Sequence, residues 1–206
     1  LSKNGIKVCE TKDLKLIDKR WLKNYFTNEI FPLLTPVAID PAHPFPFVPN
    51  LGLSLVLKLK NKKSKNIIRV VIPFPKGLKK FIKIKSVNKF IATEKIIIYF
   101  IKELFPKYNF LSYGVFRLIR DSDIEFNDEA EDLVTTFENQ LRKRRYGREV
   151  LLEMTKAIPE DLKNMIINSL KINVDNIIYA EHILDISSSN QITITASKRL
   201  KWKQFK

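Results

Sequence analysis

The residues best suited to bind an anion form one dense cationic run, LRKRRYGR, at positions 141–148. An arginine guanidinium presents a planar fork of donors that can bind phosphate or carboxylate through two hydrogen bonds. The arginines of this run are Arg142, Arg144, Arg145 and Arg148. The run predicts a corner that binds a polyanion or forms a dimer contact. The alternative is a solvated helix end whose positive charge complements the helix dipole.

A pair of carboxylates offers a second possible chemistry. Asp121 and Asp123 follow Arg120 in the sequence RDSD. Paired carboxylates can bind a divalent cation or act as general acid and base. They can equally close a turn and form ion pairs with Arg120 or Arg117. Because the sequence indicates no third acidic partner, a structural role is favoured.

The remaining candidate residues form no catalytic pattern. His43 and His182 have no second His or Cys at a metal-ligand spacing, and His43 is expected to hydrogen-bond within an ordered turn. The single cysteine, Cys9, is predicted to be a small buried apolar side chain. Neither GxxxxGK[ST] nor GxGxxG occurs, so a glycine-rich phosphate loop is absent from the sequence. The residues alone predict no catalytic residue, metal site or cofactor site in this segment.

The chain is strongly basic, with 37 Lys plus Arg against 22 Asp plus Glu and a formal net charge of +15. Such an excess attracts nucleic acid, acidic membranes or polyphosphate, although an AT-rich genome would also enrich lysine. The 206 residues, 45% of them hydrophobic, suit one domain with its own core. No apolar run is long enough to predict a transmembrane helix. A single cysteine fits the reducing cytoplasm.

The most unusual element that must position these residues is IFPLLTPVAIDPAHPFPFVPNLGLSL, residues 30–55, which contains six prolines. Proline is excluded from helix interiors and central strands because it fixes φ and lacks a backbone donor. The stretch is also too apolar for a solvated linker. It is therefore expected to be a stiff, ordered connection that buries Phe31, Phe45 and Phe47.

The rest of the chain alternates between strand and helix patterns. Strands are predicted at residues 5–10, 51–60, 67–74, 79–85, 89–92, 108–119, 149–155 and 177–179, and helices at 12–31, 94–104, 127–145 and 159–170. The turn NKKSKN at 61–66 joins two strands into a hairpin. Helix 127–145 is the clearest, since acids crowd its start and bases its end. The patterns predict an α+β fold with a mixed, largely antiparallel sheet and helices packed on it, in a single compact domain preceded by an N-terminal helical segment.

Two of these blocks together resemble one enzyme family. The proline-rich stretch at 30–55 is similar to the start of the middle, or head, domain of bacterial polyphosphate kinase. FRLIRDSDIEFNDEAEDLVTTFENQLRKRRYGREVLLEM, residues 116–154, resembles the second signature block of that domain, in which an FRxxRDxD strand end leads into a helix with an acidic start and an RRxG turn. KRLKWKQF at 198–205 resembles a weakened form of the family's linker to its catalytic half.

The resemblance implies a segment of an enzyme that reversibly moves the terminal phosphate of ATP onto polyphosphate. ATP, Mg²⁺ and a phosphorylated histidine would then belong to domains outside this chain. It implies three parts: 1–34 leading in from an N-terminal domain, 35–186 as the middle domain, and 187–206 as an exit linker. The segment alone is expected to be inactive and to act as a scaffold and dimer contact in a cytoplasmic homo-oligomer, with polyphosphate as a possible ligand and nucleic acid an improbable one. The alternative is a stand-alone basic module that binds nucleic acid or acidic membrane.

Overall fold

The computed structural model describes residues 5–40, 45–84, 89–121, 149–194 and 201. The predicted helix at 127–145, His43, Asp123 and all four arginines of the cationic run lie outside these residues.

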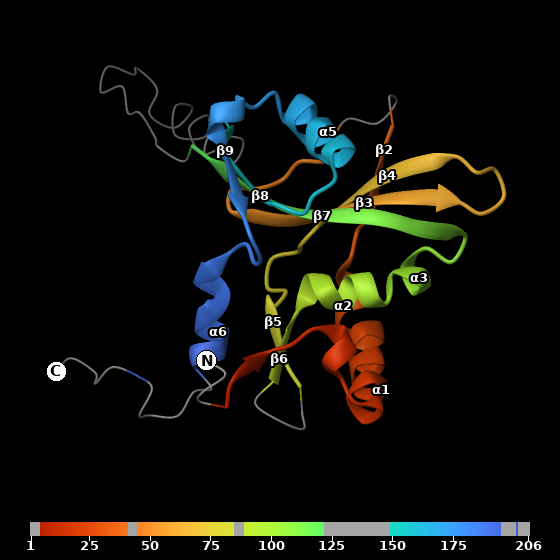
Figure 1. Cartoon of the computed structure of the whole chain (residues 1–206), viewed down its shortest axis with the longest axis vertical. Helices are drawn as coiled ribbons and strands as arrows, with labels where there is room; N and C mark the ends of the chain where they lie inside the picture. Colours follow the sequence, from red (N-terminus) through yellow and green to blue (C-terminus); the bar gives the residue numbers. More distant parts are fainter. Residues whose placement is uncertain (1–4, 41–44, 85–88, 122–148, 195–200, 202–206) are drawn as a thin grey trace, which may run out of the picture.

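A six-stranded sheet forms the centre of the molecule, in the order β2-β4-β3-β7-β8-β9 (Figure 1). Its strands are β2 (Val37–Ile39), β3 (Gly52–Asn61), β4 (Ile67–Pro73), β7 (Tyr108–Arg120), β8 (Glu149–Thr155) and β9 (Ile177–Ala180). All neighbouring pairs are antiparallel except β8 and β9, which run parallel. The predicted hairpin is confirmed, because β3 and β4 pair directly through the turn at 61–66.

A smaller sheet lies below the first in Figure 1, in the order β1-β6-β5. It is formed by β1 (Lys7–Val8), β5 (Phe81–Lys83) and β6 (Lys89–Ala92). The first strand pairs parallel to β6, whereas β5 and β6 are antiparallel. Both sheets are therefore mixed and the larger one is mostly antiparallel, which confirms the predicted α+β class.

Helices cover both faces of the larger sheet, because its central strand is apolar on both sides. Leu55 and Leu57 of β3 join one core cluster and Val56 joins the other. The first face is covered by α1 (Leu16–Tyr25), α2 (Thr93–Tyr99) and α3 (Ile101–Leu104), and the second by α5 (Glu160–Leu170) (Figure 1). Two-sided burial is typical of a strand in the middle of a layered domain.

The helix predicted at 12–31 begins later and ends less regularly than its pattern suggested. A 3-10 turn at Thr11–Asp13 comes first, and the extended backbone of Leu14 and Lys15 separates it from α1. After Tyr25 the chain continues as a π-helical turn and then a 3-10 turn that ends at Leu33. Ile17 in the first turn of α1 is 70% exposed, whereas Leu14, ahead of the helix, is buried in the core.

The described part of the proline-rich stretch is ordered, but two of its three aromatic side chains are not buried as predicted. Its only described strand before β3 is β2, which lies at the sheet edge where proline is tolerated. Phe45 is half-buried with its ring 6.2 Å from that of Phe116. The prediction was wrong for Phe31 and Phe47, which are 42% and 43% exposed. Both lie outside the sheet: Phe31 is in a 3-10 turn with its ring edge-on to that of Phe26, and the ring of Phe47 lies over the guanidinium of Arg120.

The first residues of the predicted exit linker fold against the smaller sheet. A 3-10 turn (Ile186–Ser189) leads into α6 (Asn190–Thr193). Ile192 is buried in a cluster with Phe81 and Phe90, and the Phe81 backbone N–H donates to Gln191 Oε1 at 3.0 Å. The three part boundaries remain predictions.

Candidate functional site

The end of strand β7 carries the most heavily bonded side chain near the candidate residues, Arg120. Its Nη1 lies 2.7 Å from Glu149 Oε1, and its Nε donates to the Val48 carbonyl oxygen at 2.8 Å. The Phe47 ring centroid lies 4.8 Å from the guanidinium carbon. The Arg120 backbone N–H donates to Asn50 Oδ1 at 2.9 Å. Arg120 is 7% exposed, and a buried cation is tolerated only with such partners.

Arg117, three residues earlier on β7, contacts the same proline-rich stretch. Its Nε donates to the Leu51 carbonyl oxygen at 3.4 Å, and its Nη1 lies 3.1 Å from Glu153. Its Nη2 is 3.9 Å from Asp185 Oδ1. Burial alone would raise the pKa of Asp185, but hydroxyl donors of neighbouring serines and the charge of Arg117 outweigh burial and hold that pKa below its ordinary value.

The two arginines thus connect blocks that lie far apart in the sequence. The side chains of Arg117 and Arg120 both reach carbonyl groups of residues 48–51. The sequence suggested Asp121 and Asp123 as partners, and this stays a prediction because Asp123 lies outside the described residues. In the structure, the acidic partners of the two arginines include Glu149, Glu153 and Asp185. No local sequence pattern identifies those partners, because strand pairing brings them into reach.

The cationic run itself lies outside the described residues, so its four arginines remain a prediction. The structure does place both ends of the segment that carries it. Arg120 and Glu149 are register partners across β7 and β8, which fixes the chain on either side of residues 122–148. Asp121 is exposed at that junction.

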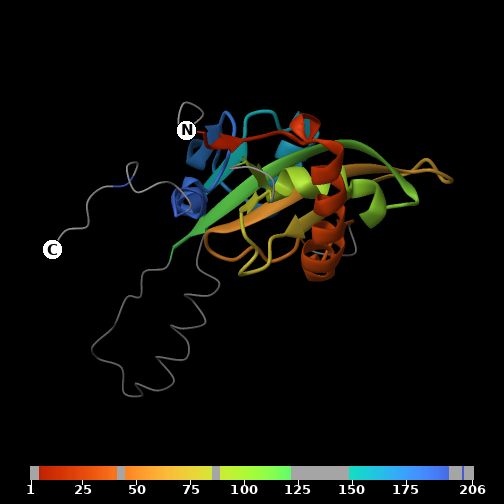
Figure 2. The same ribbon diagram turned by 90° about the horizontal axis from the view of Figure 1, so that it is seen from below.

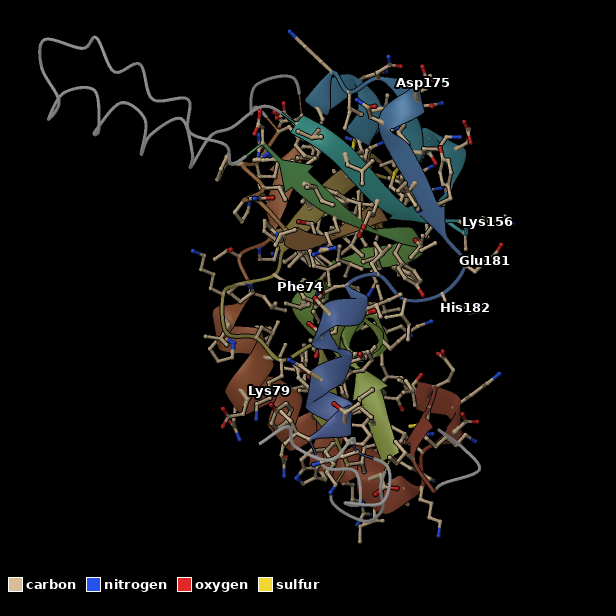
Figure 3. All side chains as sticks on the ribbon, turned by 90° about the vertical axis from the view of Figure 1, so that its left-hand side faces the viewer. Phe74, Lys79, Lys156, Asp175, Glu181 and His182 are labelled. Atoms are coloured by element: carbon tan, nitrogen blue, oxygen red, sulfur yellow. The ribbon has the colours of Figure 1, made fainter. Side chains whose placement is uncertain are left out.

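A pocket of about 420 Å³ lies between the two sheets. Its charged wall consists of carboxylates that already have lysine partners: Glu94 with Lys80 at 2.6 Å, Glu10 with Lys95 at 3.3 Å, and Glu181 with Lys156 at 2.6 Å. Figure 3 shows Lys156, Glu181 and His182 next to one another on this side of the molecule. The charges on the wall are therefore paired within the protein.

The pocket does not assemble an activated nucleophile. Cys9 lines it but is 4% exposed, and its thiol donates to the Phe90 carbonyl oxygen at 3.3 Å. Burial raises the pKa of this thiol, which disfavours the reactive thiolate. Cys9 is thus the buried apolar side chain that its sequence context predicted. His182 is exposed at the rim.

The Lys95 ammonium faces the same pocket. Burial lowers its pKa, but Tyr113 and Glu10 raise it by more, so the net pKa lies above its ordinary value. The group therefore stays charged near neutral pH and is not a general base.

Over the residues that the structure describes, no three His, Cys, Asp or Glu side chains gather as a metal site. No helix within the same residues has the length and apolar character needed to cross a bilayer.

Comparison with known proteins identifies the family. A family model described as the polyphosphate kinase middle domain matches residues 18–192. The polyphosphate kinase of Erythrobacter litoralis is 41% identical over 155 residues, which is 75% of this chain and 21% of that protein. The polyphosphate kinase of Prosthecochloris aestuarii is 31% identical over 215 residues, covering 100% of this chain and 30% of that protein.

A solved structure supports the fold. The crystal structure of polyphosphate kinase from Porphyromonas gingivalis matches with a TM-score of 0.73 and 18% identity, over 97% of this chain and 28% of that chain. The chain spans about a fifth to a third of the length of the relatives it matches. The family model covers most of the sequence, and the chain therefore belongs to the polyphosphate kinase family, within which it corresponds to the middle domain.

Proposed function

We propose that this chain is part of an enzyme that reversibly transfers the terminal phosphate of ATP to inorganic polyphosphate. The observation that carries the proposal is the family match over residues 18–192, with relatives named polyphosphate kinase. The contacts of Arg117 and Arg120 with residues 48–51 add support, because they join the two blocks that resemble the family. The same match favours this function over a stand-alone module for nucleic acid or acidic membrane.

Within that enzyme the segment has a structural role. Its buried cations are bonded to carboxylates of the same segment, as in Lys80 with Glu94 and Arg120 with Glu149. Such pairs hold elements together, and the cationic groups within them are not available to a substrate. ATP, Mg²⁺ and the phosphorylated histidine belong, in this proposal, to the larger part of the relatives that the chain does not cover.

The proposed role includes contact with a second copy of the chain. Strand β9 is an edge strand, and its Ile178 and Tyr179 are 50% and 46% exposed. Val150 on the neighbouring strand is 47% exposed. An edge strand with apolar side chains offers both backbone groups and hydrophobic area to a partner, which supports a homo-oligomer.

A reducing cytoplasm is the proposed location. The one cysteine, Cys9, is free and buried, which fits a protein that does not depend on disulfides.

The central experiment uses the full-length protein that contains this sequence. With ATP, Mg²⁺ and a polyphosphate primer, it is expected to lengthen the primer and release ADP, and to make ATP from polyphosphate and ADP. The 206-residue chain alone is expected to do neither and to carry no phosphohistidine. Absence of both reactions in the folded full-length protein contradicts the proposed activity.

The dimer contact is tested by mass. Ile178→Asp with Tyr179→Asp places charge on the β9 edge and is expected to lower the mass measured by light scattering at micromolar protein. Leu16→Asp with Ile17→Asp, at positions of α1 that are 69% and 70% exposed, is the matched control. Equal masses for the wild type and the double variant contradict the contact.

A further inference from the structure

A long part of the sequence carries positive charge with no acidic residue to balance it. Between Asp40 and Glu94 there are eleven lysines and one arginine, and no Asp or Glu. The chain as a whole has 22 acidic residues, so the imbalance is concentrated here. Helix dipoles do not explain it, because the described lysines of this stretch lie in strands, turns and loops.

The structure places four of these lysines, together with Lys107, at one end of the molecule. We define the lysine tip as Lys60, Lys62, Lys63, Lys65 and Lys107. The first four belong to the β3–β4 hairpin, and the Lys62 backbone N–H donates to the Lys107 carbonyl oxygen at 3.0 Å. Figures 1 and 2 show the hairpin projecting beside the turn before β7, away from the body of the domain.

The hairpin turn is ordered by its own hydrogen bonds. Asn61 Oδ1 accepts from the backbone N–H groups of Lys63 and Ser64, at 2.9 and 3.1 Å. Lys65 adopts a left-handed conformation with φ 63°. Its backbone N–H donates to the Asn61 carbonyl oxygen at 3.1 Å. The backbone thus presents the lysines from a fixed turn, which lowers the entropic cost of binding a ligand there.

Two acidic side chains on neighbouring elements already have cationic partners. Asp161 Oδ2 lies 2.7 Å from Lys58 Nζ and 3.7 Å from Arg69 Nη2. Outside the tip, Lys58 and Arg69 are the cationic residues of β3 and β4 that come closest in sequence to the hairpin turn. Glu103, in the helix before Lys107, pairs with Lys23 at 3.2 Å. Within the described parts of the chain, the structure shows no ion pair for any lysine of the tip. The Lys62 ammonium donates to the Pro106 carbonyl oxygen at 2.7 Å, a neutral partner that leaves the positive charge of the tip without a carboxylate among the described residues.

We propose that the lysine tip is an auxiliary binding site for a linear phosphate polymer. This inference rests on the proposed function for its choice of polyphosphate. Lysine ammonium groups bind phosphate as mobile point charges, so the tip suits a repetitive polyanion that can slide along it. The hairpin sequence KLKNKKSKN at 58–66 has no aromatic side chain. Phe105 and Tyr108, on either side of Lys107, pack edge-to-face on each other and against the core. Because these rings are engaged in packing, stacking of bases at the tip is disfavoured, and with it single-stranded nucleic acid.

The test compares two variants of the 206-residue chain that lose equal charge. Lys60→Gln, Lys63→Gln and Lys65→Gln neutralise the tip. Lys12→Gln, Lys15→Gln and Lys171→Gln are the matched control, because these lysines are exposed and Lys171 shares the left-handed backbone of Lys65. Thermal melting checks that both variants fold.

The probe is fluorescently labelled polyphosphate, titrated at two salt concentrations. The tip variant is expected to bind about tenfold or more weakly at low salt, and the slope of log affinity against log salt to become shallower by about 2, since each lost phosphate contact contributes about 0.7. The control variant is expected to stay within about twofold of the wild type. A triple arginine variant of the tip is expected to restore binding.

Equal affinity of the tip and control variants overturns the proposal. So does tighter binding of oligo(dT), or of vesicles with acidic lipid, than of polyphosphate with the same charge, because the ligand class is then wrong. Phosphate transfer by the full-length protein is measured separately. Transfer without tip binding contradicts this inference alone, whereas tip binding without transfer contradicts the proposed enzyme activity alone.

Discussion

Arg120 and Glu149 are joined twice, once as register partners across β7 and β8 and once by an ion pair of 2.7 Å between Nη1 and Oε1. They are 29 residues apart in sequence. Closing a loop of that length costs chain entropy, and the ion pair sits at the point of closure. The same guanidinium also holds the Val48 carbonyl at 2.8 Å, so one side chain joins β7, β8 and the proline-rich stretch.

The first prediction compares the two partners of this ion pair. Arg120→Met keeps the apolar stem but leaves the Val48 carbonyl and Glu149 without their donor, and is expected to destabilise the fold by about 3–5 kcal/mol. Glu149→Gln is expected to cost less, because the amide oxygen still accepts from Arg120. Urea denaturation measures both. The ranking fails if Glu149→Gln costs as much as Arg120→Met.

The second prediction orders three phenylalanines by burial. Phe116 is fully buried, and Phe116→Ala is expected to cost about 3–5 kcal/mol. Phe45→Ala should cost less, because Phe45 is only half-buried against Phe116. Phe47→Leu mainly loses the ring beside Arg120, worth about 0.5–2 kcal/mol. If the decreases in melting temperature rank in a different order, the burial of each ring does not determine the loss of stability.

The third prediction concerns a close approach at Gly114 in β7. A Cβ added there would lie 2.3 Å from Ile158 Cγ1 and 2.4 Å from its Cδ1. Gly114→Ala is therefore expected to destabilise by about 1–3 kcal/mol through overpacking. In an Ile158→Ala background the same change should cost much less, since the clashing atoms are gone. Additive costs in the double-mutant cycle would contradict the contact.

The fourth prediction concerns acid stability at Asp161. The hydrogen bond from Lys58, with the charges of Lys58 and Arg69, holds the pKa of Asp161 below its ordinary 3.8. A lowered pKa means that the ionised group stabilises the fold above the ordinary value, and that this contribution disappears as pH falls through the folded value.

Asp161→Asn removes that contribution. The variant is expected to be less stable than the wild type at pH 7 by under about 1 kcal/mol, because the carboxylate is partly exposed. The difference should shrink below pH 4 and be unchanged between pH 5 and 7. Denaturation at several pH values checks this, and a difference that grows on acidification contradicts it.

The sequence by itself determined most of the local structure. The alternating leucines of residues 53–59 predicted a strand with one continuous apolar face, and that face is buried in one core cluster. The polar turn at 61–66 predicted the hairpin. Cys9 was predicted to be buried and is. The strand follows from side chains that alternate with a period of two residues, the hairpin from polar turn residues, and the burial of Cys9 from its side-chain type. Each of these signals depends on only a few neighbouring residues.

The tertiary structure alone decided which distant groups meet. Arg120 binds a carbonyl 72 residues away. The same guanidinium lies over the half-exposed ring of Phe47, a contact that the hydrophobic pattern did not predict. The lysine tip likewise needed the hairpin to meet the turn at Lys107. The physical reason is that a side-chain pattern records which face is apolar, whereas register and strand order decide which partner stands opposite that face.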